Sequence, residues 1–472
     1  VVFDPHDPWA KISGPVAVAA LADPLSNGET GALVQAIASG AANPDVAKPY
    51  FIGQRALASR LGTVPARPEW NQSPAPVQLT SPIGASADGD RPPGGWTMPR
   101  SYGDAAAELK ALRESVGLID ESGLGILEVS GLDAGRFLDL VTTNDLAFLP
   151  VNAAQYTMVL DPHGRTLGDA LLYRVERDRY LVTTAPSASS SVESWLLAAQ
   201  SGATLNDLEV PTRRLPDRVS IKDLRQAADG AGQVVLGLAG PGSLALLRAL
   251  ADSPDDRRKL SRVRRFTLAS LRLVGASVVL ARTGHTGQAQ QFEVFVRLDQ
   301  ADALWSAILA RGADAGARAV GWDAWQAAGI AAGLPTIGQD LGGALAISPV
   351  QAGVGKVVRV YKPFFVGRSA LLAEPYPPRR QVFRFHLESA GDRSPAAGDP
   401  LTDSSGVCVG YVTSPPTVDG EAIGLGYGSA DAATFGAGLT ILDGGNASSS
   451  LGEKVATDQP VARAIVLARH PK

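Results

Sequence analysis

The stretch that decides the fold of this chain is LVTTNDLAFLPVNAAQYTMVLDPHGRTLGDALLYRV, residues 140–175. Two runs within it, residues 154–160 and 169–175, are apolar and rich in β-forming residues. They flank the turn DPHG at residues 161–164, where proline and glycine favour a reversal of the chain. The pattern therefore predicts a β-hairpin.

An acidic residue, Asp145, stands just before this hairpin and directly after Asn144. A partly buried carboxylate beside a hairpin can have a shifted pKa, and it can then transfer a proton or orient an amine. An aspartate that only caps a turn is the alternative, and the spacing alone favours this structural role. Both interpretations are open at this point.

Composition excludes several classes of function. The 472 residues are enough for about two to four domains, and 45% of them are hydrophobic. The net charge of −4 argues against nucleic-acid binding, and no apolar run approaches the ~18 residues that span a bilayer. A single cysteine and scattered histidines predict no disulfide framework and no metal centre, with a site built from carboxylates as the remaining alternative. We expect a cytoplasmic protein that binds neither nucleic acid nor membrane.

The order of helices and strands predicts an α+β region followed by a β domain. Helices are expected at residues 104–116, 133–141, 191–199, 243–250 and 302–310, with Gly117 as the stop of the first. From residue 379 onward the chain has short strands separated by Gly/Pro turns, as in a small β-barrel or sandwich. We therefore expect an α+β catalytic region of two interleaved subdomains at 76–378 and a β-barrel at 379–472.

The N-terminal residues 1–75 carry a second copy of a later motif. KPYFIGQRAL at residues 48–57 shares six of ten positions with KPFFVGRSAL at residues 362–371. The repeat predicts one structural unit used twice, or the remnant of a fused second copy, and coincidence is the alternative. A Pro-, Ser- and Gly-rich linker follows at residues 65–95. Residues 1–75 are thus an N-terminal extension that could bind a protein partner.

The chain resembles the glycine-cleavage T-protein family of folate-dependent aminomethyltransferases, as a divergent member, over about residues 96–442. Seven segments carry the resemblance in the family's order: GWTMPRSYGD, LRESVGLIDESGLGILEVSGLDAGRFL, TTNDL with AAQYTMVLDPHG, GLAGPGS, ARTGHTGQAQQFEVFV, AGLPTIGQDL and KPFFVGRSALL. The resemblance implies a three-domain ring around a central folate cavity, with tetrahydrofolate as cofactor.

The resemblance also implies roles for individual residues. Asp145 matches the family's key acid, which orients tetrahydrofolate and helps to protonate the leaving amine. Tyr156 matches an aromatic residue that lines the cavity, and the loop at residues 284–288 matches one that holds the pterin ring. Folate contacts are accordingly expected from five residues: Asn144, Tyr156, Asp169, His285 and Gln288.

Several positions depart from the family pattern. His285 stands in place of Tyr, and Gln288 stands in place of a Glu that pairs with the pterin. Gly329 and Ala331 replace an Arg and a Glu, and Arg is the usual partner of a folate glutamate tail. These losses make the lipoyl-bound intermediate of glycine cleavage a doubtful substrate.

Three functions are compatible with these residues. The first is a tetrahydrofolate-dependent one-carbon transferase, with a small-molecule donor of a methyl or aminomethyl group. The second is a non-catalytic scaffold with a decayed folate site, and the third is the same fold with another ligand. An open polar cavity that reaches Asp145 would favour the enzyme, and a cavity filled by the N-terminal extension would favour the scaffold. Trp322 and Trp325 are expected to pack in the core or at its rim.

Overall fold

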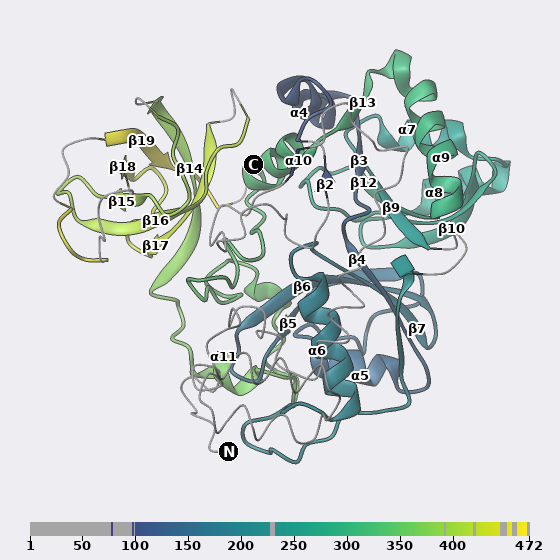
Figure 1. The fold of residues 1–472 in the computed structure, drawn as a ribbon, viewed down its shortest axis with the longest axis horizontal. Helices are drawn as coiled ribbons and strands as arrows, with labels where there is room; N and C mark the ends of the chain where they lie inside the picture. Colours follow the sequence, from purple (N-terminus) through teal and green to yellow (C-terminus); the bar gives the residue numbers. More distant parts are fainter. Residues whose placement is uncertain are drawn as a thin grey trace, which may run out of the picture.

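The structure is a computed structural model that describes residues 77–78, 97–98, 100–226, 232–390, 393–418, 422–443, 451–455 and 460–469. The expected N-terminal extension at residues 1–75, with its KPYFIGQRAL repeat, lies outside these residues, and so does the linker at residues 65–95 apart from residues 77–78. The described parts form three lobes, and each lobe is built on its own β-sheet (Figure 1). Short strands β1 (Val77–Gln78) and β2 (Thr97–Met98) form a separate antiparallel pair.

The first lobe contains the predicted hairpin. Strands β5 (Ala153–Leu160) and β6 (Thr166–Glu176) pair antiparallel across the turn, which confirms the hairpin. They belong to a five-stranded sheet in the order β5-β6-β7-β4-β8, with β7 at Arg179–Thr184, β4 at Gly125–Ser130 and β8 at Ser220–Asp223. Helices α5 (Ala134–Val141) and α6 (Ser189–Ser201) bury Phe137 and Trp195 in the core of this lobe.

The second lobe is a six-stranded sheet in the order β10-β11-β12-β9-β3-β13. Its strands are β3 (Val116–Asp120), β9 (Gln233–Ala239), β10 (Leu268–Leu273), β11 (Ala276–Ala281), β12 (Gln291–Arg297) and β13 (Ala317–Val320). Helices α7 (Ser243–Leu250), α8 (Pro254–Arg262) and α9 (Leu298–Gly312) lie beside this sheet in Figure 1 and share its leucine-rich core. β3 and β13 pair in parallel, and the other neighbours in the sheet pair antiparallel.

Helix α4 (Ala105–Glu114) leads into this sheet, and its end differs from the prediction. Asp104 caps the helix by accepting a hydrogen bond from the Ala107 N–H. Gly117 is not the stop, because the helix ends at Glu114 with Ser115 as its cap, and Gly117 lies within β3. A Cβ atom at Gly117 would lie 2.3 Å from the Leu112 side chain, so this glycine allows α4 to pack closely on the strand.

The third lobe is a closed barrel, which confirms the expected C-terminal β-barrel. Its strands are β14 (Arg380–Ala390), β15 (Pro400–Thr402), β16 (Cys408–Ser414), β17 (Ile423–Ser429), β18 (Gly438–Leu442) and β19 (Pro460–Val466). Glycines in β17 permit close packing: a Cβ atom at Gly428 would lie 2.4 Å from the Val409 carbonyl oxygen. The α+β fold with a C-terminal barrel is thus present as expected.

The segment between the second lobe and the barrel crosses the first lobe. It contains α10 (Trp322–Ala331), the short helix η7 (Gly355–Val357) and α11 (Arg368–Ala373), the last within the KPFFVGRSAL motif. Gly367 has φ +85°, and a Cβ atom there would lie 2.6 Å from the carbonyl oxygen of Asp161 in the hairpin turn. The motif therefore packs directly against the hairpin.

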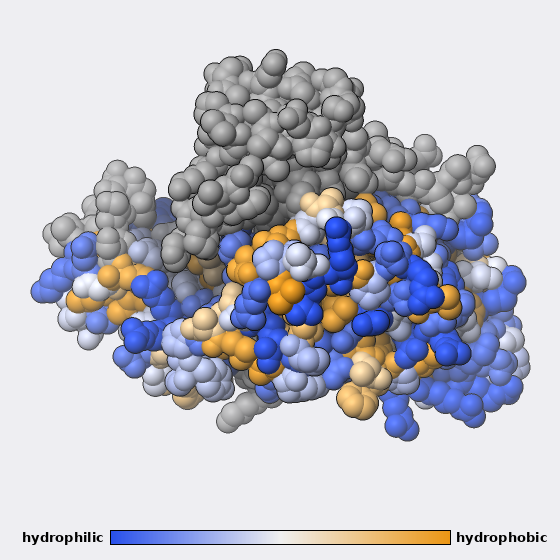
Figure 2. All heavy atoms as spheres, turned by 90° about the horizontal axis from the view of Figure 1, so that it is seen from below, coloured by the Kyte–Doolittle hydropathy of each residue, from blue (hydrophilic) through white to orange (hydrophobic). Residues whose placement is uncertain are grey.

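The surface of the described residues is mixed in character. On the face shown in Figure 2, apolar side chains occur in small groups among hydrophilic ones, as on most solvated protein surfaces. Among the helices of the described residues, none has both the length and the apolar character that a membrane span requires.

Candidate functional site

A cavity of about 870 Å³ lies where the three lobes meet. Its wall contains Tyr156 and Asp169 from the hairpin, His285 from the loop between β11 and β12, Trp325 from α10, and Thr417 from the loop that follows β16. A cavity of this size is suited to a ligand of a few hundred daltons. Four of the predicted folate contacts, at positions 156, 169, 285 and 288, line this one cavity.

Tyr156 and Asp169 face each other across β5 and β6. The Tyr156 hydroxyl donates a hydrogen bond of 2.9 Å to Asp169 Oδ2, while the buried Asp169 Oδ1 has no partner among the described residues. Burial raises the pKa of Asp169, and burial together with Asp169 raises the pKa of Tyr156 well above its usual value. The phenol therefore stays protonated, and one carboxylate oxygen is available to accept a hydrogen bond from a ligand.

His285 lies beside a buried carboxylate. Its Nε2 is 3.5 Å from Oε1 of Glu293, which is fully buried in β12. Burial opposes protonation of the imidazole, but Glu293, with contributions from Glu121 and Asp169, raises the pKa of His285 to about 9. The imidazole is therefore protonated near neutral pH and presents a positive charge at the cavity wall.

Sequence reasoning did not identify Glu293 and Glu121. Glu293 accepts hydrogen bonds from the hydroxyls of Tyr173 and Thr283, and its pKa is lowered despite its burial because His285 and these hydroxyls stabilise the charge. Burial raises the pKa of Glu121 to about 8, and Glu293 adds to the shift. A charged residue inside the apolar run FEVFV could have pointed to Glu293, whereas no pattern marks Glu121.

Gly237 makes room for the carboxyl group of Glu121. A Cβ atom at Gly237 would lie 2.7 Å from the Glu121 carboxyl carbon, so the strand β9 can accept this carboxyl only because a glycine stands there. Near neutral pH, Glu293 is ionised while His285 and Glu121 carry protons. Of these three residues only His285 lines the cavity, so its proton lies at the ligand space, while Glu121 and Glu293 lie behind the wall.

This arrangement predicts a stability that falls as pH rises. Glu121 has its folded-state pKa raised from 4.5 to about 8, so the stability present below pH 4.5 is lost as pH rises towards 8. His285 acts in the same direction, between 6.5 and about 9. We expect Glu121→Gln to flatten the fall in unfolding free energy between about pH 5 and 8, by up to about 1.4 kcal/mol per pH unit.

Urea unfolding at several pH values measures this effect. Glu114→Gln, an exposed glutamate on α4, is the matched control and should retain the parent's slope. An unchanged slope in the Glu121 variant would mean that this carboxyl does not stay protonated in the folded protein.

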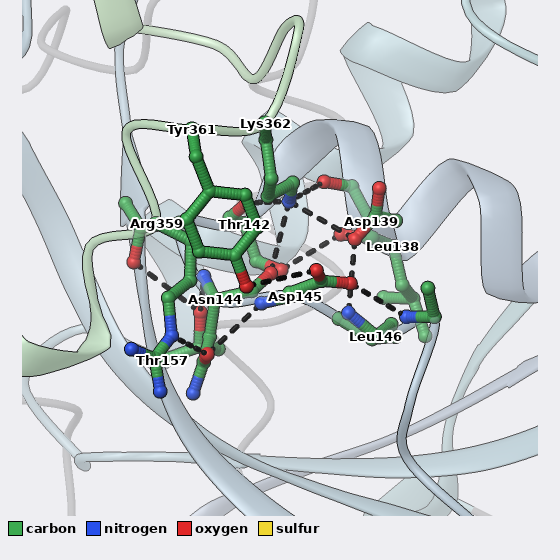
Figure 3. A network of polar contacts seen from close by, with 12 residues as sticks. Leu138, Asp139, Thr142, Asn144, Asp145, Leu146, Thr157, Arg359, Tyr361 and Lys362 are labelled. Atoms are coloured by element: carbon green, nitrogen blue, oxygen red, sulfur yellow. Dashed lines mark hydrogen bonds and ion pairs between the residues drawn. The ribbon is translucent and has the colours of Figure 1, made fainter.

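Asn144 and Asp145 lie in a second polar network, in the loop after α5 (Figure 3). Neither residue is among those that line the cavity, so the criterion of a cavity that reaches Asp145 is not met by the lining residues, and the expected folate contacts of both residues stay predictions. Asp145 accepts hydrogen bonds from the Ala147 N–H at 2.8 Å and from the Tyr361 hydroxyl at 3.0 Å. The Asn144 side-chain amide donates to the main-chain carbonyl of Tyr156 at 2.8 Å, which connects this loop to the cavity wall.

Lys362, the first residue of the KPFFVGRSAL motif, anchors this loop through its main-chain carbonyls. Its buried ammonium donates to the carbonyls of Asp139, Thr142 and Asn144, and its nitrogen lies 3.0 Å from Asp139 Oδ1. Arg359 Nε donates to the Asn144 side-chain oxygen at 3.1 Å. Sequence reasoning singled out this motif as a repeat but did not predict that it positions Asp145 (Figure 3).

Two tryptophans of α10 form an aromatic part of the cavity wall, with their rings tilted by 39° relative to each other. The rings of Trp322 and Trp325 lie 4.8 Å apart between centroids, and both line the cavity. Both side chains are half-buried, which fits the predicted packing at the rim of the core, and they also present aromatic surface to the cavity, as a platform for ring stacking would. Gly329 lines the cavity too, and a Cβ atom there would lie 3.2 Å from the His285 carbonyl oxygen. A larger residue at 329 would therefore press on the His285 loop.

Comparisons with known proteins identify the family of this chain. Residues 91–362 match the family described as GCVT N-terminal domain. An aminomethyltransferase of Shouchella clausii is 34% identical over 356 residues, which cover 74% of this chain and 88% of that protein. An aminomethyltransferase of Streptomyces avermitilis is 32% identical over 358 residues, with the same coverage of 74% and 88%.

A solved structure shares the fold. The crystal structure of glycine cleavage system aminomethyltransferase T from Bartonella henselae superposes with a TM-score of 0.62 at 21% identity, covering 79% of this chain and 91% of that one. The family match over more than half of the chain, the sequence relatives and the shared fold lead to one conclusion. This chain belongs to the glycine-cleavage T-protein family, the family of the aminomethyltransferases.

Proposed function

We propose that this chain is a tetrahydrofolate-dependent one-carbon transferase, which moves a methyl or aminomethyl carbon from a small-molecule donor to folate. The observation that carries the proposal is the central cavity, whose volume of about 870 Å³ is large enough for folate. Membership of a family whose relatives are named aminomethyltransferase supports the transferase class.

The cavity residues fit a reduced pterin. Asp169 Oδ1 is buried without a partner among the described residues, so it can accept a hydrogen bond from the amino or ring N–H edge of the pterin. The amide of Gln288 can donate and accept, and Trp322 and Trp325 offer a surface for a flat ring. Tyr156 keeps the Asp169 carboxylate oriented. When bound, tetrahydrofolate supplies the nitrogen that accepts the carbon.

Proton transfer to the leaving amine has two candidate groups. The resemblance assigns it to Asp145, whose loop is connected to the cavity wall through Asn144 and Tyr156. His285 is the second candidate, because it lines the cavity and is protonated near neutral pH. We propose Asp145 for this step and treat His285 as the competing assignment.

Calorimetric titration with tetrahydrofolate tests the proposal. We expect the parent to bind in the micromolar range and Asp169→Asn to bind about tenfold more weakly, since the variant loses a charged acceptor. Asp302→Asn removes an exposed carboxylate on α9, away from the cavity, and should bind like the parent.

Absence of binding at millimolar tetrahydrofolate would contradict the folate hypothesis. The scaffold alternative predicts that outcome, together with no turnover of any methylated donor. Equal affinities of the Asp169 and Asp302 variants would leave folate binding intact but would remove Asp169 from the pterin site.

A further inference from the structure

A turn between the first and second lobes brings two arginines to the same rim of the cavity. Arg265 and Phe266 precede β10, and Arg282 follows β11, so the antiparallel pairing of these strands places them side by side. The Phe266 N–H donates to the Arg282 carbonyl at 3.1 Å, and the Arg282 N–H donates to the Thr267 carbonyl at 3.0 Å. Arg265, Phe266 and Arg282 all line the cavity.

Phe266 has a backbone conformation that aromatic residues rarely adopt. Its φ is +60°, in the left-handed region that favours glycine. The main chain of Phe266 is held by both lobes. Its N–H donates to the Arg282 carbonyl in the second lobe, and its carbonyl accepts a hydrogen bond of 2.8 Å from the Ala154 N–H at the start of β5 in the first lobe. Strained residues of this kind persist where the surrounding structure holds them, often at ligand sites. The result here is a large, partly exposed aromatic side chain at the cavity rim.

The two arginines carry uncompensated charge. Among the described residues, neither Arg265 nor Arg282 forms an ion pair with a carboxylate, whereas Arg100, also at the cavity, lies 3.0 Å from Asp323. Arg282 Nη2 donates to the Ala289 carbonyl at 3.0 Å, but its buried Nε has no partner within the described part of the chain. Such a rim favours an anion, and a guanidinium fork matches a carboxylate best.

We propose that Arg265 and Arg282, with the ring of Phe266, bind the carboxylate-bearing glutamate tail of folate. This inference rests on the proposed function. Asp169 and Gln288 then remain available for the pterin end, so these two residues and the two arginines recognise different parts of the ligand and fix its direction. The rim takes the place of an arginine anchor at position 329, where glycine provides no side chain to reach the tail.

The assignment predicts a preference for longer tails, because each γ-linked glutamate adds a carboxylate. We expect calorimetry on the full chain to give tighter binding of an oligoglutamyl tetrahydrofolate than of the monoglutamyl form. Arg265→Gln should remove most of this preference, weakening the oligoglutamyl form by about tenfold and the monoglutamyl form less. Added salt should weaken oligoglutamyl binding in the parent more than in the variant.

Arg264→Gln is the matched control. Arg264 is an exposed neighbour with the same charge, but it does not line the cavity, so this variant should keep the parent's preference. Arg265→Lys, which keeps the charge but loses the guanidinium fork, should fall between the parent and Arg265→Gln. Arg282→Gln should act in the same direction as Arg265→Gln.

The possible results separate this inference from the function on which it rests. If both folate forms bind the parent equally, or if the Arg264 and Arg265 variants lose affinity equally, the rim assignment is overturned while folate binding stands. If Arg265→Gln changes the KM of the one-carbon donor and leaves the folate affinity unchanged, the rim binds the donor, and the assignment is likewise overturned. If neither folate form binds the parent at millimolar concentration, the proposed function fails as well.

Discussion

Replacing Asp145 by Asn should reduce turnover by about 100-fold or more while leaving tetrahydrofolate affinity within about threefold of the parent. The amide is nearly isosteric and can still accept hydrogen bonds from Tyr361 and from the Ala147 N–H, so the loop should keep its shape. The loss would then reflect the missing proton transfer and not a collapsed site. Steady-state kinetics with a methylated donor, together with calorimetry, separate the two effects.

Two further variants make this expectation specific. Asp302→Asn controls for the loss of a carboxylate outside the site and should retain the parent's rate. His285→Gln tests the competing assignment, since it removes the protonated imidazole from the cavity wall. If Asp145→Asn keeps turnover within twofold and His285→Gln abolishes it, the acid is His285 and the assignment to Asp145 is wrong.

Replacing Lys362 by Met should lower the free energy of unfolding by about 2–4 kcal/mol. The ammonium donates to three main-chain carbonyls and pairs with Asp139, and the side chain is only 3% exposed. Methionine keeps an unbranched side chain that is one atom shorter, and it leaves those carbonyls without a donor. Because the same contacts position Asp145, turnover should fall together with stability.

Lys356→Met is the matched control for the loss of stability expected in Lys362→Met. Lys356 is an exposed lysine in η7, a few residues upstream in the same segment, and its replacement should change stability by less than about 0.5 kcal/mol. Urea unfolding of the parent and both variants gives the difference. Equal stabilities of the two variants would show that the buried ammonium contributes nothing net to the fold.

Local patterns in the sequence predicted the elements whose signals lie within a few residues. The hairpin at β5 and β6 follows from its Pro–Gly turn, and α7 follows from its apolar periodicity. Helix α8 was not predicted because PDDRRKLSR is almost entirely charged, and α10 was not predicted because WDAWQAAGIA is apolar nearly all round. Gly117 was misread because a glycine at a close contact resembles a glycine that ends a helix.

Part of the candidate site was predictable, because family motifs are short stretches that can be read directly in the sequence. The resemblance identified Tyr156, Asp169, His285 and Gln288, and the cavity brings them together. The ion pair of His285 with Glu293 and the contact of Asp145 with Tyr361 depend on how the lobes meet. Long-range neighbours of this kind leave no periodic or compositional signal in a single sequence.

The Lys362 contacts also have a consequence for the biosynthesis of this protein. The bonds from Lys362 to Thr142 and Asn144 join positions 220 and 218 residues apart in the chain. On a ribosome, the first lobe can pair its strands long before this lysine emerges, but its Asn144–Asp145 loop lacks its anchor until then. Premature termination before residue 362 would therefore release a chain whose hairpin is formed but whose proposed acid is not yet fixed in place. Long-range closure of this kind is slow compared with local pairing, so maturation of the site should lag behind formation of the sheets.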